Sequence, residues 1–300
     1  MKLNALQALV AAVDEGSLRA AARRLGLTQP ALTKQVRELE RELGAPLLER
    51  TTTGVVPTAQ GKILHARAKA ATWELDEAVQ QISQMGGRMV GQLAVGAVPL
   101  ALLLLLPEAV RTFGRDYPLM MLQLREELYI GQLELLRQRL VDLVVGPIPD
   151  DLPAGEFHVE PLMPIEMAVV VGRGNPKARA RSLAELQGSR WVYTSLSGQS
   201  GYAKLLFERH GLTPPAPAAV VNSTLGLMSL IGHGDCVGLM PVPIATHPAS
   251  APFMEVVPVR EGPLPLTLGA MALSTGAVKP AVRQFLAHLH RAAAQVPAGR

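Results

Sequence analysis

Cysteine is nearly absent from this chain of 300 residues, since Cys236 is the only one. No disulfide can therefore form within the chain, and this usage is typical of a reducing compartment. The most apolar stretch, residues 98–110, contains two prolines and is too short to span a bilayer, which favours a buried helix. The first 16 residues include Asp14 and Glu15 and lack a small-residue cleavage site. They predict a helix rather than a secretion signal, and we expect a cytoplasmic protein.

Motifs of catalysis are also missing. Tyr202 stands where the G-x-S-x-G motif would need a glycine after Ser200, and Lys204 is one residue too distant for S-x-x-K. The seven histidines show no metal-ligand spacing, and no phosphate-binding or dinucleotide motif occurs. We therefore expect no enzyme, no catalytic residue, no metal and no cofactor. The alternatives are an α/β enzyme that binds a small molecule and a redox sensor built on Cys236, neither with a DNA-binding role. Switching by an internal disulfide would need a second thiol, which favours a buried Cys236.

Positive charge is unevenly distributed. The net charge is +4; residues 1–90 hold 12 Lys and Arg against 9 Asp and Glu, whereas the remainder holds 17 against 16. From Arg19 to Arg37 there are five basic residues and no acidic one. A polyanionic partner is therefore expected at the first third of the chain.

Residues 17–43 predict two helices joined by a tight turn. The first helix, "SLRAAARRLG", ends at Gly26, and Thr28 is placed to cap the second. Pro30 is tolerated in the first turn of that second helix, because an amide there would lack a helical partner. This is a helix-turn-helix arrangement, in which the second helix enters the DNA major groove by its N-terminal end.

The second helix begins with residue types that read DNA. Gln29 can bind adenine through two hydrogen bonds, and Pro30 can contact a thymine methyl group. Lys34 and Arg37 are expected at phosphates, and Thr28 caps the helix or contacts a phosphate. The following segment, "APLLERTTTGVVPT", predicts a hairpin that contacts the DNA backbone as a wing. The predicted DNA contacts are Thr28, Gln29, Pro30, Thr33, Lys34, Arg37, Arg50 and Thr52.

A long helix is predicted after Pro57. Its apolar residues alternate at spacings of four and three, which is typical of a coiled-coil seam. An ordinary helix packed on its own domain is the alternative, and the length and the break at Gly86 and Gly87 favour a dimerising linker. The predicted seam is Leu64, Ala68, Ala71, Leu75, Ala78, Ile82 and Met85.

Beyond residue 90, short β-rich runs alternate with helical runs, as in a parallel sheet with crossover helices. The strands are too many for one small sheet, so two α/β halves with a cleft between them are expected. The predicted domains are a DNA-binding domain at 1–58, a linker helix at 59–87 and a regulatory domain at 90–300. Its halves are predicted at about 90–161 with 267–300, and at about 162–266.

The first 65 residues or so closely resemble the LysR-type transcriptional regulators, through the motifs "TQPALT", "LGAPLLER" and "PTAQG". Thr33 stands where that family usually has serine, and Leu48 where it usually has phenylalanine. Over the whole chain the resemblance implies a winged helix-turn-helix and a dimerising linker helix. It also implies a regulatory domain like a periplasmic binding protein, built of two Rossmann-like subdomains.

The resemblance further implies a sequence-specific regulator of transcription. Such regulators are usually homotetramers on inverted-repeat operators, built from dimers, and a small inducer in the cleft controls them. Ligands of open α/β sheets bind beyond the carboxyl ends of strands, which here points to "AVPLA", "TSLSGQSG" and "VNSTLG". The hydroxyl groups of the last two loops could equally serve as plain helix caps.

At the first loop this chain departs from its relatives. Val98 and Leu100 flank Pro99 where relatives often carry a Ser or Thr pair, and Pro147 stands where some relatives have arginine. We expect a more apolar pocket that holds an organic anion, such as an aromatic carboxylate or sulfonate, mainly from the second half. An uncharged ligand stays open, and Tyr129 could supply a wall. The expected effector contacts are Val98, Pro99, Leu100, Tyr129, Pro147, Ser195, Ser197, Gln199, Asn222 and Thr224.

Overall fold

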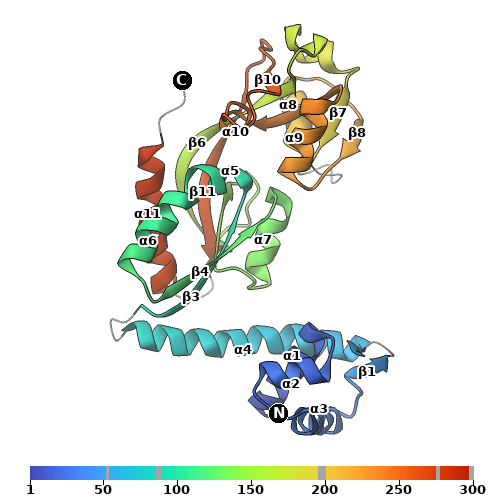
Figure 1. Ribbon diagram of the computed structural model, residues 1–300, viewed down its shortest axis with the longest axis vertical. Coiled ribbons are helices and arrows are strands. Elements are labelled where there is room, and N and C mark those ends of the chain that lie inside the picture. The colour runs from blue at the N-terminus through green and yellow to red at the C-terminus, as the bar shows by residue number, and fades with distance from the viewer. Residues whose placement is uncertain (52–53, 86–88, 195–200, 275–277, 297–300) are drawn as a thin grey trace. The chain divides into compact units, whose positions relative to one another are not determined.

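The chain folds into two compact units, Met1–Arg88 and Met89–Arg300, in the computed structural model (Figure 1). Each unit has its own buried apolar clusters. The structure describes residues 1–51, 54–85, 89–194, 201–274 and 278–296.

The first unit combines helices with a two-stranded antiparallel hairpin. Gly16 and Gly26 have φ of 61° and 65°, the left-handed conformation that ends a helix and favours glycine. Ser17 Oγ accepts a hydrogen bond from the Ala20 amide at 3.4 Å, so this side chain caps the helix that begins at Leu18. The elements are α1 Leu3–Glu15, α2 Leu18–Arg24, α3 Gln29–Leu43, β1 Leu48–Thr51, β2 Gly54–Pro57 and α4 Ala59–Met85.

The start of α4 is fixed to the segment before the hairpin by close backbone contact. The Thr58 amide donates to the Leu47 carbonyl at 3.0 Å, and the Thr58 hydroxyl donates to the Pro46 carbonyl at 2.8 Å. The same hydroxyl oxygen accepts from the Gly61 amide at 2.9 Å. A Cβ on Gly61 would lie 1.9 Å from the Leu47 carbonyl oxygen, so only glycine fits. The motif "PTAQG" is therefore the junction that sets where the long helix begins.

The predicted seam of α4 divides into two parts. Leu64 packs against the apolar cluster that contains Leu9 of α1, and Ala68 is only 2% exposed. Further along the helix Leu75 and Ile82 are 49% and 70% exposed, and Ala71 and Ala78 are exposed as well. The predicted seam thus begins with covered side chains and continues with exposed ones, and dimerisation through α4 stays a prediction. The Met85 side chain lies outside the described part of the chain.

The second unit is built on one mixed sheet in the order β4-β3-β5-β11-β6-β9-β7-β8, with β10 paired to β6. At one end β3 runs parallel to β4 and β5, and at the other β7 runs parallel to β8 and β9. The strands are β3 Gly91–Ala97, β4 Met120–Glu126, β5 Leu143–Pro147, β6 Phe157–Gly172, β7 Arg190–Tyr193, β8 Pro217–Val220, β9 Cys236–Pro241, β10 Met254–Val256 and β11 Leu264–Leu273. The α-helices are α5 Pro99–Leu104, α6 Leu106–Asp116, α7 Tyr129–Arg137, α8 Tyr202–Arg209, α9 Thr224–His233, α10 Val242–Ala245 and α11 Pro280–Gln295, and two short 3-10 turns are η1 Pro176–Arg179 and η2 Leu183–Leu186.

Two long antiparallel strands, β6 and β11, join the parallel groups into two α/β halves (Figure 1). The later part of β6 pairs with β9, while the later part of β11 pairs with β5. Their register shifts between Leu268 and Gly269, where a bulge interrupts the ladder. The boundaries of the halves predicted from the sequence, near 161 and 267, lie beside this bulge and stay a prediction.

Each half has an aromatic centre. In the first half, Phe113 of α6 and Phe285 of α11 meet edge to face with ring centroids 5.2 Å apart. In the second half, the ring centroids of Trp191 and Phe207 are also 5.2 Å apart, and the Trp191 indole donates to the Leu186 carbonyl at 2.8 Å. All four rings are fully buried. These cores fix the ends of the strands from which the cleft described below is formed.

Candidate functional site

The N-terminal end of α3 is exposed, as a groove-reading helix requires. Thr28 caps the helix, its hydroxyl oxygen accepting from the Ala31 amide at 3.3 Å. Gln29 and Pro30 follow as the first two helical residues, and both are exposed. The structure thus places the amide side chain and the proline ring at the free tip of the helix.

One face of α3 is buried and the opposite face is open. Leu32, Val36 and Leu39 are at most 4% exposed and hold the helix on the first unit. The open face is a shallow hollow that contains five predicted DNA contacts together with two residues that the sequence analysis did not select. Its lining is Gln29, Pro30, Thr33, Lys34, Arg37, Glu38 and Arg41.

Helical spacing explains this grouping, since residues three and four positions apart share one face. The same spacing could have revealed Arg41, which lies one turn beyond Arg37. Glu38 offsets little of the positive charge on this face. The Lys34 ammonium lies 4.0 Å from the Glu38 carboxylate, and a surface ion pair of this kind contributes little to stability. The face therefore keeps its basic character.

The hairpin contributes less to the described site. Arg50 is exposed on β1, where it is paired in register with Val55 of β2. Thr52 lies outside the described residues. The structure thus brings one of the two predicted wing residues to an exposed strand.

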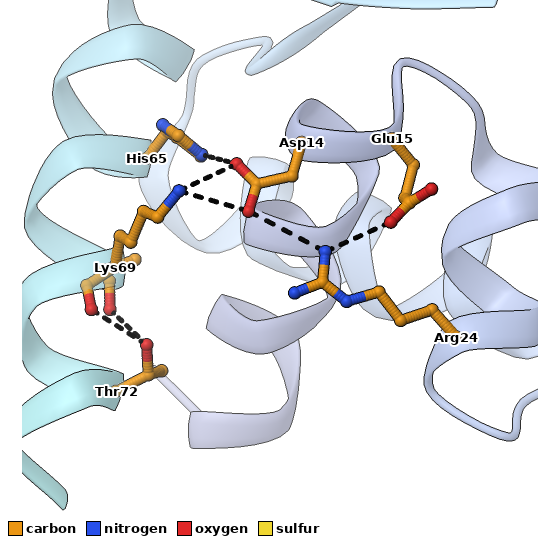
Figure 2. Close-up of polar contacts among 7 residues, drawn as sticks. Asp14, Glu15, Arg24, His65, Lys69 and Thr72 are labelled. Atoms are coloured by element: carbon orange, nitrogen blue, oxygen red, sulfur yellow. Dashed lines mark hydrogen bonds and ion pairs between the residues drawn. The ribbon is translucent and has the colours of Figure 1, made fainter. Parts of the chain in front are cut away.

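A carboxylate-centred network ties α4 to the first two helices (Figure 2). Asp14 Oδ1 lies 2.9 Å from His65 Nε2 and accepts from the Lys69 ammonium at 3.2 Å. Arg24 approaches Asp14 Oδ2 at 3.8 Å and donates to Glu15 at 3.1 Å. Burial raises the pKa of Asp14, but the hydrogen bonds from His65 and Lys69 outweigh it and hold the pKa below its usual value. Arg24 is thus engaged within the unit rather than directed at a polyanion.

A cleft in the second unit lies at the carboxyl ends of several strands. Its volume is about 100 Å³, and it is enclosed mainly by apolar side chains. Half of the ten expected effector contacts belong to its lining: Val98, Pro99, Leu100, Pro147 and Thr224.

The other five expected contacts have different positions. Tyr129 begins α7 directly after the lining residue Leu128, and its side chain lies outside the described part of the structure. Asn222 is exposed and does not belong to the lining. Ser195, Ser197 and Gln199 lie outside the described residues.

Other lining residues were not selected from the sequence. Ile165 and Met167 come from the middle of β6, where nothing in a strand pattern indicates a ligand. Pro241 and Ile244 could have been predicted, because they lie where β9 ends and α10 begins. A strand followed by the start of a helix marks the same edge of the sheet as the three loops chosen from the sequence. The lining residues not selected are Leu128, Ile165, Met167, Val192, Tyr193, Thr194, Gly201, Tyr202, Ala203, Leu227, Leu239, Met240, Pro241 and Ile244.

Among the described lining residues of this cleft, polar side chains are few and come from the second half. They are Tyr193, Thr194, Tyr202 and Thr224. The Tyr193 hydroxyl donates to the Pro215 carbonyl at 2.7 Å, and burial raises the pKa of this phenol. The Tyr193 hydroxyl therefore stabilises the fold through this hydrogen bond, while the ring of Tyr193 lines the cleft.

Neither metal ligation nor thiol chemistry is indicated in the described residues. No group of three or more His, Cys, Asp or Glu side chains among them is arranged to hold a metal ion. Cys236 is 6% exposed, and burial raises the pKa of its thiol, as expected of an unreactive cysteine. Within the same residues, no helix combines the length and the apolarity needed to cross a bilayer.

Family models match both units. The model "Bacterial regulatory helix-turn-helix protein, lysR family" matches residues 3–62, and the model "LysR substrate binding domain" matches residues 86–294. Together these matches include α3 and the lining of the cleft.

Several known regulators are similar to this chain. The HTH-type transcriptional regulator TdcA of Escherichia coli strain K12 is 26% identical over 251 residues, covering 83% of this chain and 80% of TdcA. GbpR of Rhizobium radiobacter is 32% identical over 193 residues, covering 63% of this chain and 64% of GbpR.

Solved structures show the same fold. The crystal structure of CbnR, a LysR family transcriptional regulator, has a TM-score of 0.70 at 21% identity, covering 98% of this chain and 99% of CbnR. Full-length CbnR in complex with its target DNA has a TM-score of 0.71, with 97% of this chain and all of that chain covered. This chain therefore belongs to the LysR family of bacterial transcriptional regulators, with a helix-turn-helix domain before a LysR substrate-binding domain.

Proposed function

We propose that this regulator reads an inverted-repeat operator with the exposed tip of α3 and responds to a small organic molecule in the cleft of its second unit. The observation that carries the DNA part is the position of Gln29 and Pro30, both exposed at the N-terminal end of a helix whose opposite face is buried. A side chain at this end of a recognition helix reaches base edges in the major groove.

Within this proposal the residues of the α3 face divide by role. Gln29 reads a base through its amide, and Lys34, Arg37 and Arg41 neutralise phosphates. Thr33 donates its hydroxyl proton to the Gln29 carbonyl at 2.8 Å. Its oxygen is then left to accept a hydrogen bond, which suits a base with an amino group facing the major groove.

We propose that the chain acts as a homodimer or homotetramer. Support comes from α4, where Leu75 and Ile82 are exposed on the part of the helix beyond the contact with α1. A pair of recognition helices then reads two half-sites related by two-fold symmetry, one helical turn or a multiple of it apart.

A regulator rather than an enzyme is the function that the relatives support, since their names describe transcriptional regulators. We extend this to the absence of a catalytic reaction, because the described cleft residues offer no nucleophile paired with a base, and we also propose that no cofactor takes part. We also place the protein in the cytoplasm, where operator DNA is found in bacteria.

Selection of bound duplexes from a random-sequence library tests the DNA part of the proposal. The full chain is expected to enrich sites with two inverted half-sites whose centres lie one helical turn or a multiple apart. Enrichment of a single unrepeated site would contradict the two-fold arrangement. Absence of any enriched sequence would contradict base reading by α3.

A further inference from the structure

We infer that the cleft of the second unit takes an uncharged organic molecule of about one ring, whose single polar group faces the second half. This inference rests on the proposal that the cleft is the inducer site, and it departs from the organic anion that the sequence suggested. It follows from three properties of the lining: its charge, its backbone donors and its size.

The lining offers no cation to an anionic ligand. Among its described residues there is no Lys, Arg, His, Asp or Glu. A carboxylate taken out of water is stabilised only by a paired charge or several hydrogen bonds, so such a site disfavours the ionised form.

Prolines reduce the number of backbone donors along the cleft. Proline lacks an N–H group, and it occurs at three element ends in the lining. Pro99 is the first residue of α5, Pro147 is the last residue of β5, and Pro241 precedes α10. The amide of Val98, next to Pro99, already donates to the Val145 carbonyl at 3.0 Å. The first half of the unit therefore offers a ligand no polar side chain among the described lining residues, and its nearest backbone donors are the amides of the first turn of α5.

The second half contributes the polar groups. Tyr193 ends β7, and its carbonyl accepts from the Val221 amide at 2.9 Å beyond the end of β8, which holds the two strand ends together. Thr194 follows directly, and Thr224 opens α9, so both hydroxyl groups lie on this side of the lining. The Tyr193 hydroxyl is engaged with Pro215; besides Tyr202, the other hydroxyl groups of the described lining are those of Thr194 and Thr224. One hydroxyl or carbonyl group on the ligand would satisfy them.

The size of the cleft sets the size of the ligand. Its volume of about 100 Å³ is of the same order as the roughly 150 Å³ of an engineered apolar cavity that binds benzene. A single ring with one short substituent fits this space, with the ring against the first half and the substituent toward Thr194 and Thr224.

Binding of benzyl alcohol and of benzoate to the full chain tests the inference, because the two probes share a ring and differ in charge. Calorimetry at pH 7.5 is expected to give benzyl alcohol a dissociation constant at least ~10-fold lower than that of benzoate. An equal or tighter affinity for benzoate would overturn the inference, and so would failure of benzyl alcohol to bind.

Two substitutions at one position locate the binding in the cleft. Thr224→Lys adds a cation to the lining and is expected to reverse the preference, so that benzoate becomes the tighter probe. Thr224→Val keeps the shape without the hydroxyl and is expected to weaken benzyl alcohol about 3- to 10-fold. Ser229→Lys is the matched control, since Ser229 is exposed on the same helix and does not line the cleft. It is expected to leave both affinities unchanged, and reversal by this control too would place the probes elsewhere and overturn the inference.

The inducer role is read separately, from the footprint of the chain on its selected operator with and without benzyl alcohol. A changed footprint supports both the inducer site and its ligand class. Tight binding of benzyl alcohol with an unchanged footprint would support the ligand class and contradict the inducer role. Unliganded melting temperatures of the variants identify any that fail to fold, and the Thr224→Val variant, nearly isosteric, keeps the test decisive if the lysine is not tolerated.

Discussion

Gln29 and Lys34 lie on the same open face of α3, but their side chains differ in what they can recognise. We expect Gln29→Ala to weaken binding to the selected operator by about 1–3 kcal/mol, because a two-bond contact to a base edge is lost. Affinity for random DNA should stay the same, since that binding depends on phosphates. Gel shifts on both duplexes measure the difference, and an equal loss on the two would rule out base reading by Gln29.

Lys34→Ala serves as the matched comparison on this face. We expect it to weaken binding to the operator and to random DNA alike, and to lower the slope of log affinity against log salt by about 1. The Lys34 ammonium is only 4.0 Å from Glu38 and is mainly exposed, so its loss should leave folding intact. A loss confined to the operator would mean that Lys34 contacts a base instead.

At this scale the local signals in the sequence predicted the helix that begins at Gln29 and Pro30, whereas Arg41 on the same face of α3 was not predicted. The predicted cap at Thr28 and the predicted helix end at Gly26 depend only on neighbouring residues, and the structure confirms both. The cleft was only half predictable. Met167 and Met240 reach it through strand pairing between distant segments, which no short stretch of sequence encodes.

The joint between the hairpin segment and α4 depends on one glycine. A Cβ at Gly61 would meet the Leu47 carbonyl oxygen at 1.9 Å, and the backbone there cannot move without losing the Thr58 contacts. We therefore expect Gly61→Ala to destabilise the first unit by about 2 kcal/mol or more, as overpacking at a rigid contact does. Chemical denaturation of the full chain, followed by the transition of that unit, measures the loss.

Gly114→Ala in α6 is the control for this substitution. Nothing lies within 4 Å of the added Cβ, and alanine is the better helix former. We expect a gain of about 0.5–1 kcal/mol in the free energy of unfolding of the second unit. If both alanines proved equally harmless, the close approach of Gly61 to Leu47 would be contradicted.

The Asp14 network makes the attachment of α4 to α1 dependent on pH. Because the pKa of Asp14 is lowered from 3.8, its stabilisation is complete above that value and is lost as the pH falls through the lowered pKa. Asp14→Asn should therefore lower the free energy of unfolding by about 1 kcal/mol at pH 7 and by almost nothing at pH 2. The effect is small because the Asp14 side chain is 22% exposed and partly screened by water.

Thermal unfolding of both forms across this pH range measures the effect. Glu15→Gln is the matched control, because Glu15 contacts Arg24 but neither side chain of α4 in this network. It should cost less than Asp14→Asn at pH 7. If the stability difference between wild type and Asp14→Asn stayed constant from pH 7 to pH 2, the role of the Asp14 charge would be contradicted.

Periodicity indicated that α4 is long and has an apolar stripe, but it could not indicate what covers the stripe. Leu64 packs against an apolar cluster of the first unit and Ala68 is buried, whereas Leu75 and Ile82 are exposed further along. Both parts have the same spacing in sequence, and only tertiary contacts distinguish them. A heptad pattern is satisfied equally by a neighbouring helix and by a second subunit.

For the whole molecule, self-association should depend on the exposed part of α4. We expect Ile82→Lys, at a side chain 70% exposed, to lower the fraction of dimer without lowering the melting temperature. Operator affinity should then fall at least ~10-fold at low protein concentration, because two half-sites are no longer bound together. Sedimentation velocity measures the association, and an unchanged oligomeric state would assign dimerisation to another surface.

The two central strands of the second unit also bear on how such a protein could have arisen. The chain leaves the first half along β6 and returns along β11, and these strands are hydrogen-bonded neighbours, with Met163 opposite Leu268. The roughly one hundred residues between these two positions, which form the second half, are thus inserted into the first half at two adjacent points of the chain. A tight hairpin turn between β6 and β11 could replace the second half and leave the two strands of the first half paired. A domain of this kind can therefore gain or lose its second half without breaking the sheet of the first.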